Sequence, residues 1–272
     1  MMTDKELVIE KLKSLTDKKY IYFLNSGDEA TFYLMNHLKE RGFKKILIPD
    51  AGGWFSYRKY PKKLDLGIIE IKTDDSLINI RDFEDKCEAE GFALVNSMGG
   101  YFVVEPMKDI EDICRRKYSI LINDVSASIG SQAAKYGHFC VGSFGDAKPI
   151  SLGIGGFIGS DTELEIDKSA FEVKDDFSKL SDEISSLNKK LHYWSLLRNK
   201  VIIDLKESDV LHKESDGINI VAAYENDDER ENLINYCDKN ELEYVLCPNY
   251  IKVNRKAVSI EIKRKKEVLY VE

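Results

Sequence analysis

The 272-residue sequence lacks the features that define membrane, secreted and nucleic-acid-binding proteins. It has no apolar run long enough to span a bilayer, and its amino terminus is charged from Asp4 onward, unlike a secretory signal. Its 48 acidic residues outnumber its 40 lysines and arginines, whereas nucleic-acid binding favours a concentrated basic face. We therefore expect a soluble, cytoplasmic protein that binds neither membranes nor nucleic acids.

The sequence also offers little for metal binding or disulfide bonding. Its five cysteines are odd in number and scattered, with no C-x-x-C pair, and its four histidines form no cluster. We expect buried, reduced cysteines and no metal site. The one basic run, Lys263-Arg264-Lys265-Lys266, is interpreted as the solvated end of a strand rather than a binding patch.

What the sequence does contain is a regular alternation of short apolar runs and amphipathic stretches in its first half. The apolar runs end in polar or glycine-rich turns, and a helical stretch over 28–41 stops at Gly42. Strands that alternate with helices at this spacing are typical of βαβ units and a mainly parallel sheet. The predicted strands cover residues 20–24, 45–48, 67–71, 92–96 and 118–123.

The pattern changes after Cys140. Gly155-Gly156 leads into a short strand, and residues 174–206 repeat apolar side chains at helical spacing. The last quarter predicts a strand over 218–223, a helix over 227–239, a strand over 244–247 and a hairpin with arms 250–253 and 257–263. The chain is therefore divided into a large α/β domain (1–172), a connecting helix (173–210) and a small α+β domain (211–272).

Polar residues at the ends of three predicted strands are the candidates for chemistry, because functional groups in α/β sheets gather at the carboxyl ends of the strands. At the first end, Ser26 and Glu29 have the spacing of a helix capping box. The amides at that helix start, beside Gly27, could also bind a phosphate. The carboxylates of Asp28 and Glu29 oppose an anion there, so a plain helix cap and a phosphate site both remain open.

The other two ends carry Asp124 and Lys148. Asp124 follows an apolar strand, where a carboxylate needs a hydrogen-bonding or cationic partner; it either caps the next turn or holds a protonated ring nitrogen. Lys148 lies in a serine- and glycine-rich turn before a buried strand, a setting that suits Schiff-base chemistry. The glycines that follow, over 153–156, lack the G-x-G-x-x-G spacing of a dinucleotide site.

In their order and spacing, these segments resemble the DegT/DnrJ/EryC1/StrS family of fold-type-I pyridoxal-phosphate enzymes, mostly sugar aminotransferases. The family's D-A-A-Q-S motif is similar to Asp124-Val125-Ser126-Ala127-Ser128, and its S-F-x-x-x-K motif to Ser143-Phe144 and Lys148, followed by Gly155-Gly156. Its S-G-T-E-A phosphate loop is similar to Ser26-Gly27-Asp28-Glu29-Ala30. The resemblance implies an α/β fold with a three-layer, mainly parallel (mixed) sheet of the large-domain type of these transferases.

The resemblance also implies a role for each matching residue. Lys148 would bind the cofactor, pyridoxal 5'-phosphate (PLP), as an internal aldimine, and Asp124 would keep the pyridine nitrogen protonated. Ser143 and the backbone of Gly27 and Asp28 would hold the cofactor phosphate, and Ser26 and Ser126 also count as cofactor-binding. Trp54 is placed to stack on the ring, although it is equally well explained as an ordinary core aromatic.

Three positions depart from the family pattern. Ala127 stands where the family commonly has a glutamine, and Ile154 where it has an acidic residue before the glycine pair. Asp28 stands where the family has a small hydroxyl residue beside the phosphate. The family's N-Y-R-M-like segment also has no clear counterpart around 175–187. The resemblance is therefore closer on the cofactor side than on the substrate side.

The leading hypothesis is a PLP-dependent aminotransferase that moves an amino group from an amino-acid donor to a keto acceptor, which the resemblance makes a keto-sugar. The first alternative is another PLP reaction, such as elimination, decarboxylation or aldol cleavage. The second is a non-catalytic PLP-binding homologue that acts as a partner protein. A homodimer is expected from the resemblance, because fold-type-I active sites lie at a subunit interface.

Overall fold

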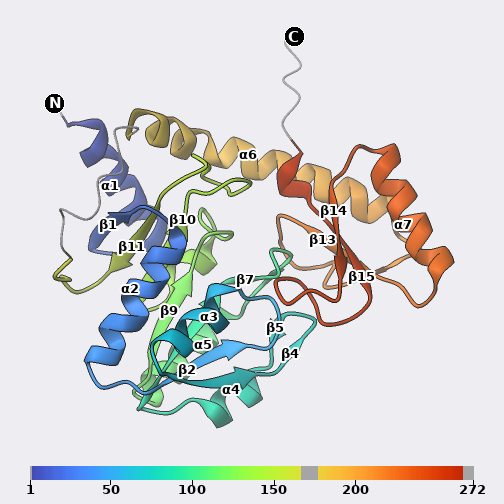
Figure 1. Ribbon diagram of the computed structural model, residues 1–272. Coiled ribbons are helices and arrows are strands. Elements are labelled where there is room, and N and C mark those ends of the chain that lie inside the picture. The colour runs from blue at the N-terminus through green and yellow to red at the C-terminus, as the bar shows by residue number, and fades with distance from the viewer. Residues whose placement is uncertain (1, 167–176, 266–272) are drawn as a thin grey trace.

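The computed structural model describes residues 2–166 and 177–265, and its largest element is a seven-stranded sheet (Figure 1). In spatial order its strands are β1 (Tyr20–Leu24), β11 (Gly156–Ser160), β10 (Phe139–Ser143), β9 (Ile120–Asp124), β6 (Gly91–Asn96), β2 (Lys45–Pro49) and β3 (Gly67–Ile71). The strands from β10 to β3 run parallel, whereas β11 is antiparallel to both β10 and β1. The predicted mainly parallel, mixed sheet is confirmed.

Successive residues of a strand point to opposite sides of the sheet, so both faces of this sheet carry apolar side chains. Helices cover both faces. On one face, α2 (Gly27–Glu40) and α3 (Ser56–Lys63) pack on a cluster that includes Ile46 and Ile48. The other face, which includes Leu47 and Cys140, is covered by α1 (Asp4–Thr16), α4 (Ile80–Lys86), α5 (Met107–Arg116) and the first half of α6 (Phe177–Asp204). The sheet and its helices therefore form the three predicted layers.

A four-stranded antiparallel sheet forms the carboxyl-terminal part of the described chain (Figure 1). Its order is β12 (Asp209–Val210), β13 (Ile220–Ala223), β15 (Ala257–Ile260) and β14 (Tyr244–Cys247). The second half of α6 and α7 (Asp227–Lys239) pack on it through a cluster that includes Trp194, Val201 and Leu233. α6 thus contacts both sheets. The domain boundaries after residues 172 and 210 stay predictions, and the first lies outside the described residues.

The predicted hairpin with arms 250–253 and 257–263 is wrong. β15 pairs instead with β14, with Ala257 opposite Cys247, and residues 248–256 form the connection. Pro248 offers no backbone N–H to a strand ladder. Asn249 forms a local turn, because its side chain accepts a hydrogen bond from the amide of Ile251 and its carbonyl accepts one from Lys252. This turn excludes the strand that the apolar residues of the stretch suggested.

Short elements complete the described fold. They are the strand pairs β4 (Thr73–Asp74) with β5 (Leu77–Ile78) and β7 (Met98–Gly99) with β8 (Val103–Val104), and 3-10 turns over Gln132–Lys135 and Ile262–Arg264. In the part of the chain that the structure describes, no helix is both long enough and apolar enough to cross a membrane.

One buried carboxyl group predicts how the stability depends on pH. Glu105 is 4% exposed, and its Oε2 atom accepts a hydrogen bond from the amide of Ile78. Burial raises the pKa of Glu105 from 4.5 to about 8, so between these values the folded chain binds more protons than the unfolded chain. The free energy of unfolding should therefore fall by about 2–4 kcal/mol as the pH rises through this range.

Glu105→Gln is expected to remove most of this loss, which urea unfolding at about pH 5 and about pH 8 would measure. Glu84→Gln is the matched control, because Glu84 is 45% exposed and pairs with Arg116 on the surface. An unfolding free energy whose pH dependence is the same in wild type and Glu105→Gln would rule out this role for Glu105.

Candidate active site

The carboxyl ends of β9 and β10 and the start of α2 meet in a pocket with about 470 Å³ of empty space. All eight residues predicted to catalyse or to bind cofactor line this pocket, and their individual roles stay predictions. They are Ser26, Gly27, Asp28, Trp54, Asp124, Ser126, Ser143 and Lys148, and Thr31 and Tyr101 join them. Three strand ends that are far apart in the sequence thus contribute to one site.

Three serines that line the pocket have hydroxyl groups able to donate hydrogen bonds. The Oγ atom of Ser26 accepts the amide of Glu29 at 3.1 Å, that of Ser126 the amide of Ser143 at 3.0 Å, and that of Ser143 the amide of Gly145 at 3.1 Å. Each oxygen already accepts a backbone N–H, and each keeps its own hydrogen to give to an acceptor in the pocket.

The capping box expected at the start of α2 forms only in part. Ser26 accepts the amide of Glu29 as expected, but the Glu29 carboxylate accepts the amide of Asn25 at 3.0 Å, one residue before the cap. This contact occupies one oxygen of the Glu29 carboxylate with a backbone amide. The start of α2, where backbone amides and the helix dipole favour an anion, lines the pocket through Ser26, Gly27 and Asp28.

Gly27 is required by the close approach of α2 to β10 and β11. A Cβ atom on Gly27 would lie 2.7 Å from the Cβ of Ser143, and one on Gly156 would lie 2.5 Å from the amide nitrogen of Gly27. Both distances are far shorter than side chains allow. The two glycines therefore let the strand ends approach the helix start closely enough to form one pocket wall.

Asp124 has the hydrogen-bonding partners that a buried carboxylate needs. It is 9% exposed; Tyr57 donates its hydroxyl to Oδ2 at 2.6 Å, and the amide of Ser126 donates to Oδ1 at 2.9 Å. Burial, followed by the charge of Asp124, raises the pKa of Tyr57 well above its ordinary value, so Tyr57 keeps its hydrogen. Asp124 thus caps the turn after β9 and also lines the pocket.

Lys148 extends into the pocket between two aromatic rings. Its Nζ atom lies 5.1 Å from the ring centre of Trp54 and 4.5 Å from that of Tyr101. It also donates a hydrogen bond to the Tyr101 hydroxyl at 2.6 Å. Aromatic faces attract an ammonium group electrostatically, so the two rings and the hydroxyl fix the nitrogen in position.

The three departures from the family pattern lie in different surroundings. Ala127 is 1% exposed and packs in the cluster that includes Tyr101 and Trp194. Ile154 is 65% exposed and does not line the pocket. Asp28 does line it, so the charged residues around the pocket are two carboxylates and one ammonium. Only Asp28 changes the electrostatics of the pocket itself.

Several residues next to Lys148 were not predicted from the sequence, and one expectation about them is wrong. Lys263, expected at a solvated strand end, has a side chain that is only 7% exposed. Its Nζ atom lies 3.6 Å from the ring centre of Tyr101 and pairs with buried Glu261. The Gly99-Gly100 pair before Tyr101 was a signal for an unusual backbone, but nothing in the sequence linked this tyrosine to Lys148.

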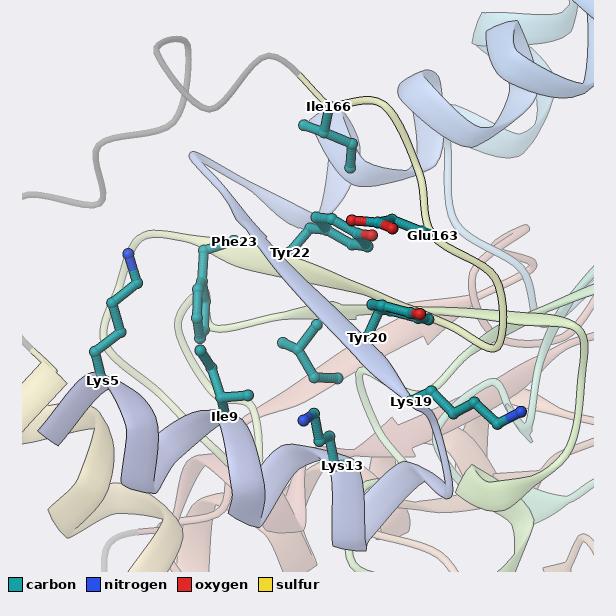
Figure 2. Close-up of a pocket in the computed structure, with 10 residues that line it drawn as sticks. Lys5, Ile9, Lys13, Lys19, Tyr20, Tyr22, Phe23, Glu163 and Ile166 are labelled. Atoms are coloured by element: carbon teal, nitrogen blue, oxygen red, sulfur yellow. The ribbon is translucent and has the colours of Figure 1, made fainter. Parts of the chain in front are cut away.

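The described part of the chain also has cavities outside this pocket, two of them against α6 and α1. One has about 1320 Å³ of empty space, adjoins the pocket at Lys148 and is lined by α6 and the segment after β15. The other lies between α1 and β1, where Ile9, Tyr20 and Tyr22 form its wall (Figure 2). That second cavity contains none of the predicted site residues, so the chemistry is expected at Lys148.

The fold is that of known PLP-dependent enzymes, and the predicted resemblance is confirmed at this level. A structure titled NifS-like protein matches with a TM-score of 0.74 and 12% identity over 97% of this chain and 83% of that chain. A DegT/DnrJ/EryC1/StrS aminotransferase from Brucella abortus matches with a TM-score of 0.73 and 14% identity over 96% and 85% of the two chains. These identities establish a shared fold.

Two other comparisons bear on the chain. A GDP-4-keto-6-deoxymannose-3-dehydratase with a trapped PLP–glutamate geminal diamine matches with a TM-score of 0.74 and 15% identity, covering 96% of this chain and 88% of that chain. Residues 177–268 match the model for the MJ1341 family C-terminal domain. No curated protein matches the sequence.

Proposed function

We propose that this protein is a PLP-dependent aminotransferase with Lys148 as the lysine that binds the cofactor. The observation that carries the proposal is the convergence of Lys148, Asp124 and three donating serine hydroxyls on one pocket at the start of α2. An amine, a carboxylate and a set of anion-binding donors match the three ends of PLP: its aldehyde, its ring nitrogen and its phosphate. The dehydratase and the aminotransferase among the similar structures support a cofactor of this kind.

Each residue of the pocket has a defined task in this proposal. Ser26, Ser126 and Ser143 would donate to the phosphate, together with the backbone of Gly27 and Asp28, and Trp54 would pack on the ring. Asp124 would accept the hydrogen of the ring nitrogen. When bound, PLP supplies an electron-withdrawing ring that stabilises negative charge on the substrate carbon next to the amino group. Lys148 would then move protons to and from that carbon.

Asp28, which departs from the family pattern, opposes a phosphate in this pocket. Asp28 lines the pocket together with Ser26, Ser126 and Ser143, and a carboxylate near a phosphate repels it. The dipole of α2 and the three hydroxyls act in the opposite direction, because both favour a negative charge at the helix start. The proposal therefore requires that these donors outweigh a single carboxylate.

The cavity that adjoins Lys148 is the proposed site for the amino donor and the keto acceptor. It is lined by polar and charged side chains from α6 and the last described segment, among them Glu183, Lys190 and Arg264. Such a lining suits polar substrates, and a keto-sugar is the acceptor that we propose. We also propose a homodimer, because sites of this fold lie at a subunit interface. The proposed location is the cytoplasm.

Visible absorbance tests the proposal directly. Purified protein mixed with PLP should gain a visible band that borohydride removes, and mass spectrometry should place the reduced adduct on the peptide that contains Lys148. Adding amino acids such as glutamate should then convert the band to that of the amine form of the cofactor. Protein that takes up no PLP would rule out the proposed function.

Another PLP reaction remains the second candidate, because Ala127, Ile154 and Asp28 change the family pattern and a dehydratase has the same fold. A band that forms but never converts with any amino donor would favour elimination, decarboxylation or aldol cleavage over amino transfer. A band with no turnover of any substrate would favour a non-catalytic partner protein.

Tyr57→Phe is expected to weaken PLP binding by about 10- to 100-fold, since Asp124 would lose a buried, charged hydrogen bond. Equilibrium titration of the visible band would measure the dissociation constant. Tyr22→Phe is a suitable control, because the Tyr22 hydroxyl accepts the amide of Leu164 and is not among the residues that line the pocket. Equal PLP affinity in wild type and Tyr57→Phe would show that Tyr57 does not orient Asp124.

A further inference from the structure

Tyr101 lines the pocket beside Lys148 but belongs to none of the predicted motifs. It is 4% exposed, and its hydroxyl oxygen lies 2.6 Å from the Nζ atom of Lys148. A hydrogen bond of this length to a buried hydroxyl is strong, because little water competes for the hydroxyl. Tyr101 therefore contacts the Nζ atom of Lys148 directly, whichever reaction that nitrogen takes part in.

The backbone at Tyr101 has a strained conformation, and hydrogen bonds hold it in place. Its φ angle is 71°, in the left-handed region that bulky residues rarely adopt. The carbonyl of Tyr101 accepts the amides of Ile218 and Asn219 at 3.0 Å each, which ties it to the chain just before β13. Strain that the surrounding structure maintains in this way is typical of functional sites.

Three lysines surround the Tyr101 ring. The Nζ atoms of Lys148, Lys252 and Lys263 lie 4.5, 4.9 and 3.6 Å from its centre. Lys252 and Lys263 both pair with Glu261, at 2.7 and 3.4 Å. The ring is thus held by a buried charge cluster of the carboxyl-terminal part, while its hydroxyl faces the pocket lysine.

We propose that Tyr101 is a catalytic residue that holds the Nζ atom of Lys148 in both of its protonation states. As an ammonium group, Lys148 donates to the Tyr101 oxygen, as the structure shows. As a neutral amine, Lys148 can accept the hydrogen of the Tyr101 hydroxyl, so the contact survives the departure of the proton. The nitrogen then stays in place when it becomes a nucleophile. The proposal rests on the proposed function, in which Lys148 captures the cofactor.

The hydroxyl must keep its hydrogen for this role. Burial raises the pKa of Tyr101 above its ordinary value, although the nearby Lys148 ammonium opposes the increase. The Tyr101 oxygen therefore remains a hydroxyl at neutral pH, able to accept from an ammonium group and to donate to an amine.

Tyr101→Phe tests the proposal, because it keeps the ring over the lysines and removes only the hydroxyl. Stopped-flow absorbance should show that cofactor-free Tyr101→Phe protein captures PLP about 10- to 100-fold more slowly than wild type. Tyr236→Phe is the control, since the hydroxyl of Tyr236, on α7, makes a similarly short hydrogen bond of 2.7 Å to Asp204. Its capture rate should equal that of wild type, and melting temperatures would verify that both variants are folded.

A second readout does not need the cofactor. Reductive methylation of Lys148 by formaldehyde and cyanoborohydride, followed by peptide mass spectrometry, reports when the amine becomes reactive as the pH rises. Tyr101→Phe removes a hydrogen bond from both forms of Lys148, but the bond to the ammonium form is charge-assisted and therefore the stronger of the two. Labelling should thus begin at lower pH than in wild type. A residue that only supports the fold would lower the melting temperature without moving this profile.

The outcomes separate the two proposals. If wild type takes up no PLP, the proposed function fails, yet a displaced methylation profile would still demonstrate the contact between Tyr101 and Lys148. If Tyr101→Phe matches wild type in both PLP capture and methylation profile, the role of Tyr101 is overturned. The same conclusion follows if Tyr236→Phe changes both readouts as much as Tyr101→Phe does.

Discussion

Lys148→Ala is expected to lose the visible PLP band and to lower turnover by about 10²–10⁴-fold, the range for removal of a positioned acid–base group. Lys148 is the ammonium group that lines the pocket, and its Nζ atom is held between Trp54 and Tyr101. Without it the chain has no amine in this position to form a covalent bond with the cofactor. PLP could then bind only through the contacts of its phosphate and ring.

Absorbance, borohydride trapping and turnover would be measured side by side for Lys148→Ala and for a control lysine. Lys86→Ala serves as that control, because Lys86 pairs with Asp82 on α4 and does not line the pocket. A small primary amine added to Lys148→Ala should restore part of the turnover if the missing amine is the defect. A Lys148→Ala protein that still gives a borohydride-stable adduct would show that another lysine holds the cofactor.

Much of the large sheet could be predicted because its inner strands β2, β6 and β9 are short, largely apolar runs that are buried on both faces. α1 was not predicted, although its signal is local: Thr3 and Glu6 form a complete capping box, with bonds of 3.3 and 2.8 Å. The turn at Asn249 was missed for a different reason. Apolar residues favoured a strand there, whereas the hydrogen bonds that the side chain and the carbonyl of Asn249 accept decided the backbone.

In the candidate site too, residues within local sequence motifs could be predicted, whereas residues defined by distant contacts could not. Asp124 and Lys148 could be proposed because each lies in a recognisable segment at a strand end. Tyr57 and Tyr101 could not, because their partners lie 67 and 47 residues away in the sequence. An ordinary tyrosine carries no mark of the residue that it will contact after folding, so positions of this kind need the structure.

Glu261→Gln is expected to destabilise the protein by about 3–5 kcal/mol, because it leaves the buried Nζ atoms of Lys252 and Lys263 without their carboxylate. The side chains of Glu261, Lys252 and Lys263 are only 3%, 5% and 7% exposed. Glu261 also accepts hydrogen bonds from Asn219 at 3.1 Å and Ser259 at 2.9 Å. Urea unfolding would measure the change. Glu243→Gln, which removes an exposed partner of Arg264, should cost no more than about 1 kcal/mol.

The pH dependence distinguishes a lost charge from lost packing at Glu261. Burial would raise the pKa of Glu261, but Lys252 and Lys263 outweigh it and lower the pKa from 4.5 to about 2. A lowered pKa in the folded state gives stability that is fully present above about pH 4.5 and is lost as the pH falls toward 2. The difference between wild type and Glu261→Gln should therefore shrink over that range. A difference that stays constant down to acid pH would mean that the shape of the side chain, and not its charge, holds the cluster under Tyr101.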